Sequence, residues 1–215
     1  MRRRSHAAAA LVAAATVLPF LPAIASAQGP AQPAAQPVAR SSTRPRVSIE
    51  PYAVNTQLDD AVNSTGRAGI NGYGVRLSIR QPARMQVGVL SRGGLTAWGH
   101  WAPERDGNVV RHLGVQQEVH VADRPILGFL DPVVSLGAGA YRLTTRYFVG
   151  AVGPYSATRE RFALTPGAGV RVLAPGGLHV RLDARDAVVF NQRDPAGRRR
   201  TLNNVEFTAG LGLTF

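Results

Sequence analysis

The chain has 215 residues, and its 25 basic residues against 13 acidic ones give it a formal net charge of +12. Every basic residue is arginine, whose guanidinium is suited to bidentate contacts with phosphate and carboxylate groups. Cysteine is absent, which excludes a disulfide framework and any thiolate metal site.

The first 27 residues have the pattern of a cleaved secretory signal peptide. Three arginines at positions 2–4 precede an apolar stretch over residues 7–24, and Ala25, Ser26 and Ala27 form a small-residue cleavage site. A membrane anchor and the twin-arginine export route are the alternatives. Because the chain is exported, we expect anionic lipopolysaccharide phosphates, and not nucleic acid, as the counter-charge for its arginines.

Residues 28–45 are rich in proline, alanine and glutamine, with hardly any large apolar side chain. Such a segment buries too little surface to offset its ordering entropy, so a disordered linker is predicted, with a polyproline-like spacer as the alternative. The folded unit is expected to span residues 46–215. No segment after the signal reaches the ~20 apolar residues that a spanning helix needs. The mature chain is therefore soluble or crosses a membrane as strands.

Residues 46–215 alternate between apolar and polar with a period of two and show no convincing helical period. In the last stretch Phe207, Leu211 and Leu213 share one face, whereas Glu206 and Thr208 lie on the other. Most of the predicted strands come near or exceed the ~9–11 residues that a tilted membrane strand requires. The eight predicted strands are residues 47–54, 69–80, 84–92, 109–121, 132–145, 162–174, 178–190 and 205–215.

The predicted connections alternate in length. Short turns are expected at residues 81–83 and 175–177 and a moderate one at 122–131, whereas longer polar loops occupy residues 55–68, 93–108, 146–161 and 191–203. Outer-membrane barrels show the same asymmetry, with short periplasmic turns and longer outer loops. This pattern predicts an all-β, eight-stranded antiparallel up-and-down transmembrane barrel. With an even strand count, both of its ends would face the periplasm.

The charged face of the strands is predicted to line the lumen. Turning that face toward lipid would cost roughly 2–4 kcal/mol for each arginine at the midplane. A solvated face of a soluble sandwich is the alternative. An eight-stranded barrel is just wide enough to be filled by its own side chains, and inward glycines would make room for long arginines. The predicted ionic network of the lumen consists of Arg76, Glu118, Arg171, Arg181, Asp183, Arg185 and Glu206.

Aromatic residues are expected to form girdles at the two membrane interfaces. The predicted outer set is Tyr73, Trp98, Trp101, Tyr141, Tyr147, Phe148, Phe162 and Phe190. The predicted periplasmic set is Phe129 and Phe215. For Trp98 and Trp101, packing within a loop is the alternative.

The ending NNVEFTAGLGLTF resembles the C-terminal assembly signal of outer-membrane proteins. By this resemblance Phe207, Leu211, Leu213 and Phe215, with Ala209, would form the strand that the barrel-assembly machinery reads. The whole of residues 46–215 resembles the small eight-stranded barrels of the porin superfamily, of the OmpA and OmpX type. The resemblance implies a bacterial outer-membrane protein, and we expect it to be monomeric.

Three functions remain open at this point. The preferred one is a structural or surface-interaction protein without cofactor or metal, in which Arg159, Arg161, Arg198, Arg199 and Arg200 on outer loops contact lipopolysaccharide. An unspecialised, solvated loop is an equal alternative for residues 198–200. The second function is a narrow, anion-favouring channel. The third is an enzyme acting on lipid A through His112, expected near the outer rim, but no nucleophile–base pair or metal-ligand cluster has a recognisable spacing.

Overall fold

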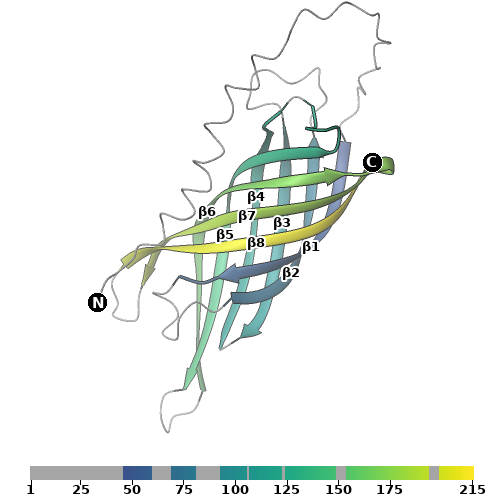
Figure 1. Cartoon of the computed structure of the whole chain (residues 1–215). Coiled ribbons are helices and arrows are strands. Elements are labelled where there is room, and N and C mark those ends of the chain that lie inside the picture. The colour runs from purple at the N-terminus through teal and green to yellow at the C-terminus, as the bar shows by residue number, and fades with distance from the viewer. Residues whose placement is uncertain are drawn as a thin grey trace, which may run out of the picture. The chain divides into compact units, whose positions relative to one another are not determined.

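The computed structural model describes residues 46–59, 69–80, 93–105, 107–122, 124–148, 154–193 and 199–215. Within them, eight antiparallel strands pair in chain order, and β1 pairs with β8 to close a barrel (Figure 1). No helix in these ranges is long and apolar enough to cross a membrane. The strands are β1 (Arg46–Gln57), β2 (Gly69–Arg80), β3 (Gly93–Arg105), β4 (Asn108–His120), β5 (Leu130–Phe148), β6 (Pro154–Leu173), β7 (Leu178–Arg193) and β8 (Arg199–Thr214).

The barrel has two distinct ends. One end, which we call the terminal end, holds Arg46 and Phe215 together with the β2–β3, β4–β5 and β6–β7 connections. The other, the hairpin end, holds the remaining four connections. The β5–β6 ladder continues to Phe148 and Pro154, whereas β4 pairs with β5 only as far as Thr145. Figure 1 shows this β5–β6 hairpin projecting beyond the other strands.

The third predicted strand was misplaced. Residues 84–92 lie outside the described residues, and the segment expected to be a long loop, residues 93–108, contains β3. Only residues 106 and 107 separate β3 from β4, whereas residues 81–92 separate β2 from β3. The expected sorting of long loops after odd strands therefore fails here. Gly93 and Gly94, at the start of the segment expected to be a loop, pair with Val119 and Glu118 in the sheet.

Strands β5, β6, β7 and β8 also extend into segments that were expected to be loops, at residues 146–161 and 191–203. The turn predicted at residues 175–177 is present as a single 3₁₀ turn. Gly176 and Gly177 there have φ angles of 77° and 83°, a left-handed conformation that favours glycine.

Many large apolar side chains of the strands point away from the barrel. Leu113, Leu136, Leu182 and Leu211 are each more than half exposed, while Arg76 on the opposite face is 1% exposed. A soluble barrel has the reverse arrangement, with apolar residues inside and charged residues in water. The outer surface therefore requires an apolar surrounding, and the arginines are enclosed.

Candidate functional site

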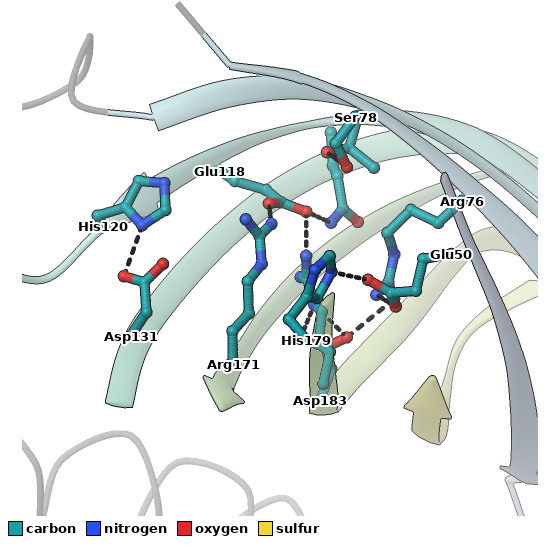
Figure 2. Close-up of polar contacts among 12 residues, drawn as sticks. Glu50, Arg76, Ser78, Glu118, His120, Asp131, Arg171, His179 and Asp183 are labelled. Carbon is teal, nitrogen blue, oxygen red and sulfur yellow. Dashed lines mark hydrogen bonds and ion pairs between the residues drawn. The ribbon is translucent and has the colours of Figure 1, made fainter. Parts of the chain in front are cut away.

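Buried ion pairs occupy the part of the lumen nearest the terminal end, and we call this group the ionic layer (Figure 2). At its centre, Arg181 donates from Nη1 to Glu118 Oε1 at 2.8 Å and from Nε to both carboxylate oxygens of Asp183 at 2.8 Å. Asp183 also pairs with Arg76 Nη2 at 2.8 Å and accepts from Thr208 Oγ1 at 3.1 Å. Buried charges persist when they are paired and hydrogen-bonded, and both carboxylates meet this condition.

The ionic layer continues to both sides of Arg181. Glu118 pairs with Arg171 and accepts a hydrogen bond from Gln116 Nε2 at 2.8 Å. On the other side Glu50 pairs with Arg76, and His179 Nε2 lies 3.3 Å from Glu50 Oε2. These side chains come from β1, β2, β4, β6 and β7, so the ionic layer cross-links strands that are distant in sequence.

A separate pair lies beside this network in Figure 2, where His120 Nδ1 is 2.7 Å from Asp131 Oδ1.

Inward glycines make room for these groups. A Cβ atom at Gly210 would lie 2.6 Å from Glu50 Oε1, and one at Gly212 would lie 2.2 Å from His179 Nε2. Distances this short are overlaps, so the buried carboxylate and imidazole occupy space that any larger residue would need.

A second group, which we call the histidine layer, lies next to the ionic layer on the side of the hairpin end. It consists of His100, His112, Arg185 and Glu206. Along β7 the inward residues run from Arg181 and Asp183 to Arg185, and along β8 from Thr208 to Glu206. Arg185 Nη2 lies 3.1 Å from Glu206 Oε2. Glu206 Oε1 lies 2.8 Å from His112 Nδ1 and 3.4 Å from His100 Nε2.

Aromatic rings enclose the histidine layer. The guanidinium of Arg185 stacks over Trp98, 4.2 Å from the ring centroid, which is a cation–π contact. His112 meets Trp98 and Tyr141 edge to face, with centroids 4.3 Å and 5.0 Å apart. Trp98 and Tyr141 were predicted for the outer girdle and are instead buried inside the barrel. His112, predicted near the outer rim, is also buried, which removes it from the position expected for an enzyme acting on lipid A.

At the hairpin end the lumen is mainly apolar, although Thr56, Asn108 and Asn204 are also buried there, and sequence reasoning missed this feature. The buried residues there form one cluster, the apolar layer: Leu58, Ile70, Ala102, Val110, Tyr141, Leu143, Ala163, Ala187, Val189 and Leu202. Along β7 it begins two residues after Arg185, at Ala187. The charged part of the lumen is therefore separated from the hairpin end by a mainly apolar layer.

The outer surface near the hairpin end combines aromatic and basic side chains. Tyr73 and Trp101 are exposed neighbours in register, with ring centroids 5.6 Å apart. The same register continues from Trp101 to Arg111 on β4 and to Arg142 on β5, both exposed. A second exposed aromatic pair, Phe162 and Phe190, stacks with centroids 6.4 Å apart. Phe129 and Phe215, predicted for the other girdle, are exposed near the terminal end.

The structure places all seven residues of the predicted lumen network on the inner face and joins each of them to another member. Sequence reasoning missed Glu50, whose position in β1 alternates with outward Ile49 and Pro51. It also missed His100, because residues 93–108 were expected to be a loop.

The other predicted positions that the structure describes are exposed or partly buried. Phe207, Leu211 and Leu213 are exposed in the half of β8 nearest the terminal end, and Phe215, which directly follows β8, is also exposed. Arg159, Arg161 and Arg199 are exposed on β6 and β8, and Arg200 is partly buried. Arg198 lies outside the described residues, as do the side chains of Tyr147 and Phe148.

Comparison with solved structures identifies the fold. The Neisserial surface protein NspA superposes with a TM-score of 0.54 at 10% identity, covering 80% of this chain and 97% of NspA. Ail of Yersinia pestis superposes with a TM-score of 0.52 at 9% identity, covering 79% of this chain and 98% of Ail. The N-terminal barrel of Pseudomonas aeruginosa OprF superposes with a TM-score of 0.50 at 11% identity, covering 78% of this chain and 97% of the OprF barrel. The fold is that of the small outer-membrane β-barrels.

A scan of protein-family models found no match, and a search of curated proteins found none either. At identities near 10% the solved structures show the shared fold alone. The arrangement of charges inside the barrel must therefore be interpreted from this chain's own residues.

Proposed function

We propose that the chain is an integral protein of the bacterial outer membrane, with both chain termini, and so the terminal end of the barrel, facing the periplasm and the hairpin end facing outside. The observation that carries this proposal is the outward apolar surface around a closed barrel with buried charges. Closure leaves no unpaired strand edge in the hydrocarbon, which is the condition for spanning a bilayer with strands. The exposed Tyr73, Trp101, Phe162 and Phe190 would mark the outer interface.

Within this proposal the leader of residues 1–27 is cleaved on export, and residues 28–45 link the leader to the barrel. The chain folds as a monomer through the barrel-assembly machinery. The outward residues Phe207, Leu211, Leu213 and Phe215 of the last strand are the face that this machinery would read.

The proposed role is structural and not that of a channel. The ionic layer and the apolar layer together fill the lumen along β7 and β8, and an apolar constriction is a barrier to ions even where water is present. We expect the refolded protein to give no stable conductance steps in planar bilayers. Discrete, anion-selective steps would contradict this and would favour a narrow pore.

We further propose that the hairpin end contacts lipopolysaccharide phosphates through arginine. Arg111 and Arg142 are cross-strand partners at the level of Trp101, where the headgroups would lie. Glu160 is the partner of Arg142 across β5 and β6, whereas Arg159 and Arg161 alternate with it and lie on the opposite face of β6, across from Leu143 and Tyr141. Guanidinium groups bind phosphate oxygens in pairs of parallel hydrogen bonds, so the outward pair Arg111 and Arg142 suits a phosphorylated glycolipid at the interface.

The test replaces Arg111 and Arg142 by glutamine. Hydrogen bonds to charged groups are each worth about 1.5–3 kcal/mol, so lipopolysaccharide affinity in detergent should fall at least about tenfold. The matched control is Arg46→Gln, an exposed arginine at the terminal end. An equal loss in the control, or unchanged binding of dephosphorylated lipid A to the wild type, would overturn the proposal.

A further inference from the structure

The histidine layer contains a set of atoms with the composition of a metal site. His100, His112 and Glu206 each offer one ligand atom, and these three atoms all lie within 4.8 Å of one another. The three residues come from β3, β4 and β8, and all three are buried. Two imidazoles and one carboxylate are the donors that bind zinc and related divalent transition metals.

The spacing of the donor atoms suits such an ion. Two atoms bound tetrahedrally to zinc at about 2.0–2.1 Å lie roughly 3.3 Å apart. His100 Nε2 is 3.4 Å from Glu206 Oε1, which already matches this separation. His112 Nδ1 is 2.8 Å from the same oxygen and would need to move outward by a few tenths of an ångström.

Neighbouring side chains would hold these ligands in the required state. Tyr52 Oη lies 3.4 Å from His100 Nδ1, so a proton on Nδ1 donated to Tyr52 leaves Nε2 free to bind the metal. Arg185 pairs with Glu206 Oε2 and leaves Oε1 toward the histidines. Metal-binding imidazoles and carboxylates are commonly oriented by such partners.

Buried polar atoms without a hydrogen bond point to the same place. Among the described residues, His100 Nε2, Glu206 Oε2 and Tyr141 Oη are buried without one, although the first two take part in ion pairs. Unsatisfied buried polar atoms are uncommon in folded proteins and need an explanation such as a bound ion or water. An ion among these ligands satisfies His100 Nε2 directly.

We propose that His100, His112 and Glu206 bind a divalent transition metal ion, such as zinc, inside the barrel. The ion cross-links β3, β4 and β8 between the ionic layer and the apolar layer. Because Arg185 places a positive charge nearby, the fourth coordination position takes a small anion such as hydroxide or chloride. The site is independent of lipopolysaccharide contact and is structural, since packed side chains cover it on both sides.

The test uses the tag-free mature chain, refolded into detergent with Zn²⁺ and then dialysed. Metal analysis should find one zinc per folded chain, and X-ray absorption at the zinc edge should show two imidazole ligands and oxygen donors. His100→Gln and His112→Ala should each lower zinc affinity at least tenfold. The control, His120→Ala, removes a buried histidine that contacts Asp131 and should leave zinc binding unchanged.

Tyr52→Phe keeps the ring and removes only the hydroxyl beside His100, so zinc affinity should fall by about 10–100-fold while the barrel stays folded. A heat-shifted gel band confirms folding for each variant. If a histidine variant fails to fold, the X-ray absorption spectrum of zinc in the wild-type protein and the zinc affinity of Tyr52→Phe still test the proposal. Wild-type protein that binds no zinc, or zinc whose spectrum lacks two imidazoles, would overturn the proposal.

Discussion

Replacing Arg181 by methionine should lower the free energy of unfolding by about 3–5 kcal/mol, because removing one partner of a buried ion pair leaves the other charge uncompensated. Arg181 is the residue that joins Glu118 to Asp183 through three contacts of 2.8 Å, and it is 1% exposed. The measurement is urea unfolding of the refolded protein in lipid vesicles.

Two further variants make this result specific. Arg142→Met removes an exposed arginine from the outer face and should change stability by less than about 0.5 kcal/mol. Adding Glu118→Leu to Arg181→Met removes both partners, and part of the lost stability should return, since apolar pairs of similar size often substitute for buried ion pairs. Equal effects of Arg181→Met and Arg142→Met would show that the lumen is open to water.

Replacing Leu182 by arginine should destabilise the inserted barrel by about 2–4 kcal/mol, the cost of an arginine on the lipid face at the bilayer midplane. Leu182 is exposed near the middle of β7, between outward Leu178 and Phe190. The cost falls to about 0–1 kcal/mol near the interface, so Leu178→Arg at the start of β7 is the matched control.

The contrast between these two positions on β7 carries the test. In a water-soluble barrel both leucines would be solvated, and arginine at either position would be nearly neutral or would improve solubility. In a lipid bilayer Leu182→Arg should be the more destabilising of the two variants, because position 182 lies deeper in the hydrocarbon than position 178. Vesicle refolding yields and unfolding curves that are the same for Leu182→Arg and Leu178→Arg would argue against a membrane-facing surface.

The strands that could be predicted from sequence are those whose two faces differ strongly. In β8 the apolar Phe207, Leu211 and Leu213 alternate with Glu206 and Thr208, so period, face and direction are all evident. In β7 the alternation of Leu182 with Arg181 and Asp183 is equally clear. A one-residue slip would move every charge into the opposite environment, and such a pattern therefore specifies register as well as strand.

β3 could not be predicted in this way because its inner face is not polar. Trp98 and Ala102 lie inside the barrel beside Thr96 and His100, so the two faces of the strand resemble each other in hydropathy. The apolar layer was missed for the same reason. Where both faces of a strand carry apolar residues, the alternation on which the prediction depended is absent.

Most members of the ionic network were predictable, but Glu50 and the pairing of the charges were not. Inward charges follow from alternation, whereas the pairing of Arg76 with Asp183 depends on how β2 and β7 face each other across the closed barrel. The grouping of His100 and His112 depends on the β3–β4 register, in which they are direct partners. A prediction that lacked β3 could not bring these two histidines together.

The most direct measurement of the central claim is contact between lipid acyl chains and individual methyl groups. With methyl-labelled protein in nanodiscs, acyl-chain cross-relaxation should reach Val115, Leu182 and Leu211, which point outward, and should be absent at Val133, Val189 and Leu202, which are buried in the lumen. Acyl-chain contacts at the second set, or water contacts alone at the first, would contradict the orientation of every strand described above.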